Sequence, residues 1–356
     1  MADSYYQIAT TPRLYVSYPL FQYANGALDQ YAIDEGLISD EELIQLIQLD
    51  PSKTITIPQS EGGAVQLNYR VNPTSDQSDM RYNKLWDFNY VMILGHNFAS
   101  ANVTYVPYIM RSNYQNAEII SNAYLKNSSL NNSVPEYDGY SISTLNANSP
   151  VQFSDHNIFR LEIKDNNLDT TLQMGSLSWG SYFDFPHNAD INESLTIDYG
   201  VKQKQTISGK TISTANWTKT DNWITEPFGL KEPYEQQSDQ FQRRSGRRTW
   251  TINFDSLAPE KVMPQYPFLN YKGFQPKANH TTDASGNSEY TINNGIDFYT
   301  KVVHRTMGGH LPMVLQLDKD VTSSEGFAIV RMDKNYKITQ KTPNLYNIRL
   351  KLIEQI

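Results

Sequence analysis

The sequence contains no cysteine in its 356 residues. This absence excludes disulfide bonds, thiolate nucleophiles and cysteine-ligated zinc or iron–sulfur sites. Charged residues are also few, at 19%, and the formal net charge is −8. An acidic chain has no general attraction for nucleic acid, so we expect no nucleic-acid partner unless a local basic patch provides one.

Long apolar runs and metal-binding spacings are missing too. No segment approaches the roughly 18 apolar residues of a membrane-spanning helix, and the start, MADSYYQIATTPRLY, lacks the regions of a secretory signal. The six histidines show no His-x-x-x-His or His-Glu-x-x-His spacing. We therefore expect no membrane span, no metal and no other cofactor, in a chain made in a cytoplasm.

The sequence is rich in tyrosine and in segments where apolar and polar residues alternate. The 24 tyrosines suit half-buried positions on sheets and at subunit contacts, because each carries an apolar ring with a polar tip. Apolar and polar residues alternate at 159–164, 195–201, 250–255 and 347–352. Such alternation is typical of antiparallel sheets with one solvated face. The sequence therefore predicts an all-β fold with two antiparallel β-sandwich or jelly-roll domains.

Domain limits follow from changes in these patterns. Residues 1–60 are interpreted as an extended N-terminal arm with one short helix at 39–49, where Ser39 and Glu42 form a capping box. A jelly-roll β-sandwich is predicted at 61–201 and a second β-sandwich at 245–356. The polar residues 202–244 between them are expected to form a connecting excursion, a crossover or projecting loop, and loops of that length are usually functional or interfacial.

A buried run that ends in Gly95, His96 and Asn97 raises a question of chemistry. His96 could serve as a catalytic base, as a metal ligand or as part of a turn. A base would need a nucleophile on a strained turn, but no Gly-x-Ser-x-Gly motif exists, and paired glycosidase carboxylates cannot be recognised in sequence. The interpretation we favour is a structural turn, in which Gly95 redirects the chain while His96 and Asn97 bind backbone groups.

Three segments carry a resemblance to a known family. NYVMILGHNFASANVTY, then FRLEIKDNN and MGSLSWGSYFDF, resemble a jelly-roll module common in bacteriophage tail proteins, with a phenylalanine where leucine is usual after His-Asn. That module is similar to discoidin-like and galactose-binding-like carbohydrate domains. RRSGRRTWTINFDSLAPE and the C-terminal segment from GFAIVRM onward look like parts of phage tail structural proteins, and TTPRLYVSYPLF resembles virion proteins of marine phages with contractile tails.

The densest charge in the sequence is a basic cluster. Four arginines in six residues can bind phosphate, bind carboxylates of an adjacent subunit, or form a solvated loop that contributes little to stability. For an acidic chain we favour subunit contact over nucleic-acid contact. The candidate contact residues are Arg243, Arg244, Arg247 and Arg248.

Aromatic side chains near Asn188 offer a second kind of site. Trp179, Tyr182 and Phe185 could stack on sugar rings if their faces are exposed. The alternative is core packing, because about half of the residues on an alternating strand point inward.

The resemblance and the interface-rich composition together imply a structural component of a phage virion, and the position we favour is the tail tip or baseplate. Its expected partners are other tail proteins and copies of itself, in a virion assembled in the host bacterial cytoplasm. The alternative is a tail module that binds a host surface glycan. A glycan-degrading enzyme is a third hypothesis, but the sequence nominates no catalytic residue, so no enzymatic activity is expected.

Overall fold

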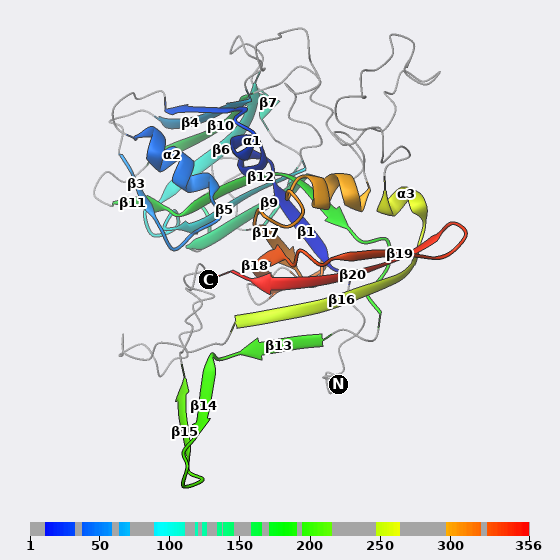
Figure 1. Cartoon of the computed structure of the whole chain (residues 1–356). Helices are drawn as coiled ribbons and strands as arrows, with labels where there is room; N and C mark the ends of the chain where they lie inside the picture. The colour runs from blue at the N-terminus through cyan, green and yellow to red at the C-terminus, as the bar shows by residue number, and fades with distance from the viewer. Residues whose placement is uncertain are drawn as a thin grey trace, which may run out of the picture.

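Strands dominate the structure of this chain. The structure, a computed structural model, describes residues 11–32, 38–58, 64–71, 89–110, 118–119, 123–126, 134–136, 138–145, 158–165, 171–190, 194–215, 247–263, 297–321 and 326–355. All of the recorded strand pairings are antiparallel, and the helices are few and short. The predicted all-β class is therefore confirmed (Figure 1).

One long sheet runs through both halves of the chain. Within the described residues it has eleven strands and extends from the edge strand β13 at one end to β8 at the other. The strands, in spatial order, are β13 (Ser194–Asp198), β16 (Arg247–Leu257), β20 (Leu345–Glu354), β18 (Phe327–Met332), β17 (Met313–Gln316), β1 (Arg13–Ser17), β12 (Ser176–Asp184), β5 (Tyr90–His96), β9 (Gly139–Leu145) and β8 (Ala123–Lys126), with β19 (Lys337–Thr342) beside β20.

A second sheet covers one face of the long sheet and makes a sandwich in the first half. Its strands, in order, are β2 (Leu28–Ala32), β4 (Ala64–Val71), β10 (Ile158–Asp165), β6 (Val103–Met110) and β7 (Glu118–Ile119). Phe159 of β10 stacks on Trp179 of β12 with 4.1 Å between ring centroids, so side chains of the two sheets meet directly. The shared core between the sheets also contains Leu67, Val91 and Leu177.

Strand β1 joins the two halves of the long sheet. It pairs with β12 on one side and with β17 on the other, so its backbone is bonded along both edges. Leu14 and Val16 enter one core and Tyr15 enters another, so both faces of the strand are buried. The sequence interpretation places these residues in an extended arm. An arm of that kind is expected to contain short strands, and the structure places one of them, β1, inside the long sheet, where both of its faces are buried.

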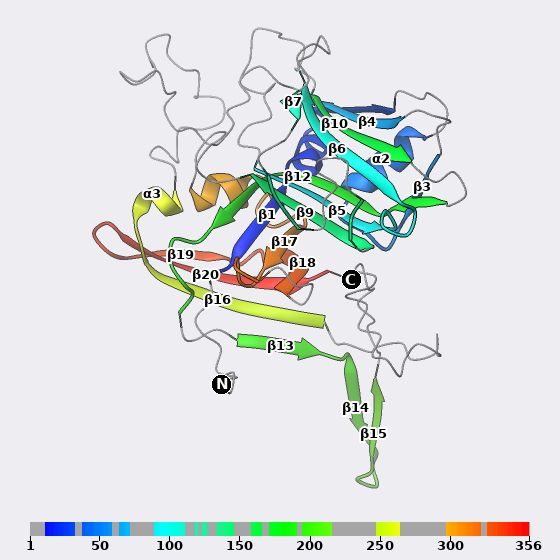
Figure 2. The same cartoon turned by 180° about the vertical axis from the view of Figure 1, so that it is seen from behind.

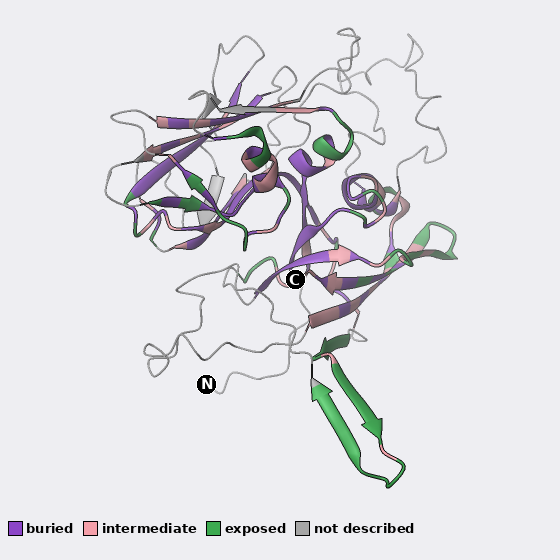
Figure 3. Cartoon of the chain, turned by 60° about the vertical axis from the view of Figure 1, so that its left-hand side comes forward, coloured by how far each residue is buried: buried purple, intermediate pink, exposed green. Residues whose placement is uncertain are grey.

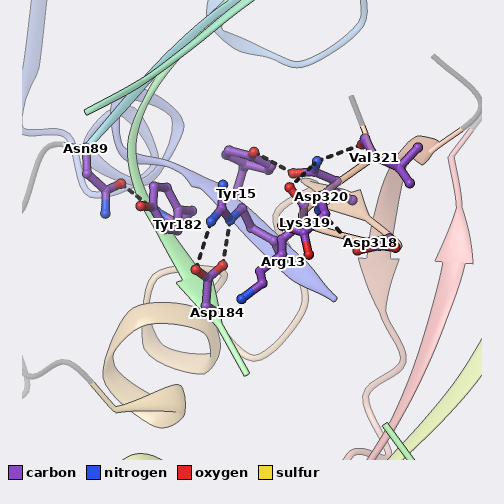
Figure 4. A network of polar contacts seen from close by, with 10 residues as sticks. Arg13, Tyr15, Asn89, Tyr182, Asp184, Asp318, Lys319, Asp320 and Val321 are labelled. Atoms are coloured by element: carbon purple, nitrogen blue, oxygen red, sulfur yellow. Dashed lines mark hydrogen bonds and ion pairs between the residues drawn. The ribbon is translucent and has the colours of Figure 1, made fainter. Parts of the chain in front are cut away.

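The contacts of β1 lock this junction (Figure 4). The Arg13 guanidinium donates to both carboxylate oxygens of Asp184, at 2.5 and 2.8 Å, and lies 3.9 Å from the ring centroid of Tyr182. The Tyr15 hydroxyl donates to Gln316 of β17 at 2.7 Å. The polar groups of β1 are thus satisfied by strands from both halves.

The predicted helix is present as α2 (Asp40–Ile47). Its capping box is formed, with the Ser39 side chain accepting from the Glu42 amide and the Glu42 carboxylate accepting from the Ser39 amide. Leu43 and Leu46 pack beneath the sandwich. The structure adds short helices that the sequence analysis does not predict, namely α1 (Tyr18–Ala24), α3 (Pro259–Val262) and the π-helix η2 (Tyr299–His304).

The second half is built on the continuation of the long sheet. Trp250, Ile252 and Phe254 of β16 point into a core that also contains Phe298 and Val302, from beside and within η2. In the part of this half that the structure describes, helical segments cover the inner face of the sheet, and no second facing sheet is present there. Two small sheets complete the fold: β3 (Ile55–Ile57) with β11 (Leu172–Met174), and β14 (Val201–Gln205) with β15 (Thr211–Ala215).

Candidate interaction surface

The turn at Gly95 ends strand β5. Gly95 has φ of +65°, and a Cβ at this position would lie 2.6 Å from the carbonyl oxygen of Pro51. Both facts require glycine, because a side chain would strain the backbone and collide with a backbone atom. The pairing with β9 shifts register between Leu94 and His96, so the turn coincides with a bulge.

His96 is buried and is engaged within the turn. Its Nε2 lies 2.9 Å from Ser141 Oγ, its Nδ1 accepts from the Phe98 amide at 3.3 Å, and its ring stacks on Phe98. Burial lowers the pKa of His96 to about 4, against a smaller raising effect of Asp138 and the Tyr140 backbone. The imidazole is therefore neutral at pH 7, with Nδ1 acting as an acceptor.

Asn97 and Asp138 bind the backbone around the same turn. The Asn97 side chain donates to the Thr171 carbonyl and accepts from the Gln173 amide, both at 2.8 Å. Asp138 accepts from the amides of Ala99 and Ser100, at 2.8 and 3.1 Å. These contacts tie three chain segments together and are directed at backbone groups.

The sugar-stacking hypothesis is corrected by the burial of its three rings. Trp179 is 1% exposed and is covered by Phe159, while Phe185 is 3% exposed and stacks on Phe254 at 3.7 Å. Tyr182 is 9% exposed and lies under the Arg13 guanidinium. Each ring has a neighbouring side chain against its face, so none offers a free surface to a sugar.

The arginine cluster is only partly within the described residues. Arg243 and Arg244 lie outside them, whereas Arg247 and Arg248 begin β16. Arg248 binds Glu354 of the same chain through its side chain, at 2.6 to 3.1 Å, and through its backbone amide, at 2.8 Å. This internal pair is the physical reason why Arg248 is not free for a neighbouring subunit. Subunit contact stays a prediction for Arg247, whose Nε is buried with no hydrogen-bond partner in the described part of the chain.

Among the residues that the structure describes, 194–215 form a strongly exposed stretch, here called the projecting segment. The β14–β15 hairpin extends away from the body in both views of the molecule (Figures 1 and 2). The strand residues of the hairpin whose side chains are described are exposed on both faces, as the green ribbon in Figure 3 shows. A two-stranded ribbon with both faces in water is at best marginally stable by itself.

Large apolar side chains on this segment are uncovered. Ile207 at the hairpin tip is fully exposed, and Ile212 in β15 is 54% exposed. Leu195 and Ile197 of β13 are 53% and 45% exposed, although Leu195 lies opposite the core residue Trp250 of β16. Among the described strands β13 pairs only with β16, so its other backbone edge is also open for pairing.

The hairpin is ordered by its turn and is cationic. The Thr206 hydroxyl accepts from the Lys210 amide at 3.1 Å and donates to the Lys210 carbonyl at 3.0 Å, while Gly209 adopts φ of +82°. Residues 199–215 contain three lysines and no acidic residue. The tip therefore presents one isoleucine among positive charges.

Sequence reasoning identified the region but not these residues. The alternation at 195–201 indicates a strand with one buried face, whereas the structure leaves Leu195 and Ile197 largely uncovered because β13 lies at the edge of the sheet. Ile207 and Ile212 are isolated in a polar stretch and carry no periodic signal. Their exposure becomes apparent only from the position of the hairpin.

The described residues offer neither a metal site nor a membrane-spanning helix. No group of three or more histidine, aspartate or glutamate side chains there is placed to hold a metal ion. No helix in that part of the structure is long and apolar enough to cross a membrane.

Comparisons with known proteins leave the family open. No protein-family model matches the chain, and no curated protein matches it. One solved structure that matches is described as CpGH89CBM32-6 produced by Clostridium perfringens, with 11% sequence identity and a TM-score of 0.29, covering 44% of this chain and 94% of that one. Neither the fold nor the ligand of this chain is inferred from a similarity at this level.

Proposed function

We propose that the chain is a structural component of a bacteriophage virion, a tail-tip or baseplate protein that holds neighbouring subunits. The resemblance of its sequence segments to phage tail proteins supports the setting. The projecting segment supports the mode of action and is the observation that carries the proposal. Its neighbours are other tail proteins and copies of this chain, joined as the virion assembles in the host bacterial cytoplasm, and no catalytic step is part of this function.

The apolar side chains of the projecting segment supply the driving force. Burial of one isoleucine or leucine side chain is worth roughly 1.5–3 kcal/mol relative to exposure. Four such residues lie within about twenty positions of the sequence, namely Leu195, Ile197, Ile207 and Ile212. Contiguous patches of exposed apolar side chains mark interaction sites in folded proteins, because their burial against a partner stabilises the assembly.

The positive charge of the hairpin helps to orient it on a partner. The hairpin carries Lys202, Lys204 and Lys210 without an acidic residue, whereas the chain as a whole has a net charge of −8. An acidic neighbour, including another copy of this chain, therefore attracts the hairpin tip. Such complementarity contributes mainly to the rate and register of association.

Substitution of the two exposed hairpin isoleucines tests this function. Phage particles whose copy of the chain carries Ile207→Asp and Ile212→Asp should fail to incorporate it, as measured by mass spectrometry of purified particles. The purified variant should keep its circular dichroism spectrum and melting temperature, because neither side chain belongs to a core. Val321→Asp, at a position 41% exposed and outside the projecting segment, is the matched control. Normal incorporation of the double variant would contradict the proposal.

A further inference from the structure

A polar hollow lies on the face of the long sheet opposite the core of the second half. Strand residues alternate between the two faces, so Phe254 and Leu350 point into the core while Asn253 and Arg349 point away from it. The hollow has a volume of about 360 Å³, within the range of roughly 300–1,000 Å³ typical of small-molecule sites. Strands β16, β19 and β20 form it together with Asp190, whose amide donates to the Asn253 carbonyl at 2.9 Å.

Two cations lie directly opposite each other in this hollow. Arg349 of β20 is in register with Lys337 of β19 on one side and with Asn253 of β16 on the other. Like charges opposite each other in an antiparallel pair destabilise the sheet, since their Cβ atoms are about 5 Å apart. An anion between the two side chains would remove this repulsion.

Neighbouring lysines on the same strands form ion pairs with aspartates, and this distinguishes them from Lys337 and Arg349. Lys351 lies 3.6 Å from an oxygen of Asp333, and Lys341 lies 3.2 Å from an oxygen of Asp255. Neither Lys337 nor Arg349 forms an ion pair in the described part of the chain, since no carboxylate oxygen there lies within 4.0 Å of their side-chain nitrogens. The hollow therefore combines two available cations with room for a ligand.

The other groups around the cations suit hydroxyl groups. Thr339 presents a hydroxyl, and the Asn347 amide is oriented by the Ser256 amide, which donates to its oxygen at 3.2 Å. Asp190 adds a carboxylate acceptor at the rim. Together with Asp255, it also disfavours a ligand group that carries two negative charges. A single carboxylate surrounded by hydroxyls matches this set of side chains.

We propose that the hollow binds a hexuronic acid residue of an acidic polysaccharide. Its carboxylate lies between Lys337 and Arg349, with the guanidinium able to donate two parallel hydrogen bonds. Its hydroxyl groups bind Thr339, Asn347 and Asp190. This site shares no residue with the projecting segment and does not depend on subunit docking.

Titration of the intact chain with oligogalacturonate by calorimetry tests the site. We expect binding with Kd of about 1 mM and none to neutral maltooligosaccharides of the same length. Lys337→Gln with Arg349→Gln should weaken binding about tenfold, because both charge-assisted contacts are lost. Thr339→Val, which changes no charge, should weaken it about threefold through one lost hydrogen bond.

A charge change of the same size outside the hollow distinguishes binding at this site from general electrostatic attraction of the acidic polysaccharide to the protein. Lys204→Gln with Lys210→Gln removes the same charge from the hairpin and should leave affinity for oligogalacturonate unchanged. Equal weakening by both double variants would overturn the proposal, as would absence of binding at about 10 mM oligogalacturonate. A glutamate oligopeptide of equal charge that binds as tightly would also overturn it, by identifying the hollow as a contact for an acidic protein segment.

Discussion

Arg13 and Asp184 form a two-point ion pair between directly opposed residues of β1 and β12. Because β1 also pairs with β17, this contact lies where the sandwich of the first half meets the sheet of the second. The Arg13 guanidinium is shielded on one side by the Tyr182 ring. The pair therefore stabilises the junction on which the arrangement of the whole chain depends.

Removal of one partner from this pair should destabilise the fold. Arg13→Met leaves the Asp184 carboxylate without its charged donor, and we expect a loss of about 2 kcal/mol in the free energy of unfolding. Denaturation in urea measures this loss as a lower midpoint at unchanged slope. Lys53→Met removes a similar ion pair, with Asp50, that lies at the surface, and should leave the midpoint unchanged. Equal midpoints for wild type and Arg13→Met would contradict the assigned role.

Stability should fall in acid because His96 is buried in its neutral form. Its pKa is about 4 in the folded chain, below the ordinary value of 6.5 expected after unfolding. Between these values the unfolded state binds a proton that the folded state does not, so the free energy of unfolding decreases as pH falls from 6.5 to 4. The decrease reaches about 3 kcal/mol. Melting or urea titrations across this range measure it.

A variant without the imidazole isolates this contribution. His96→Gln should be less stable at pH 7, since the contacts to Ser141 and Phe98 change, and should lose less stability between pH 6.5 and 4. His304, whose pKa is also lowered by burial and by Arg305, leaves a residual slope of the same sign. An unaltered slope in His96→Gln would refute the assignment.

The aromatic pair across the sandwich should matter for stability. Trp179→Ala removes a ring packed between Phe159 and Tyr69, and we expect a cost of about 3–5 kcal/mol. Thermal unfolding checks this prediction, and Val321→Ala at the surface is the control. A melting temperature unchanged by Trp179→Ala would mean that the ring is not part of the core.

Local signals in the sequence predicted the elements that depend on local chemistry. The capping box fixes α2, and Gly95 ends β5 because its conformation excludes other residues. The position of β1 was not predictable, because pairing with β12 and β17 joins residues more than 160 positions apart. The exposure of Ile197 could not be predicted from the sequence for a related reason. Alternation shows that a strand has an apolar face but not whether another layer covers that face.

The central claim is that the projecting segment docks on neighbouring subunits, and the absence of cysteine allows a direct test. Ile207→Cys places the chain's only thiol at the hairpin tip, where a maleimide should label it rapidly in the isolated protein. In assembled particles the account predicts that labelling slows at least about tenfold, while Lys334→Cys, at an exposed position outside the segment, is labelled as fast as before. Equal labelling of the Ile207→Cys thiol in isolated and assembled protein would contradict the account.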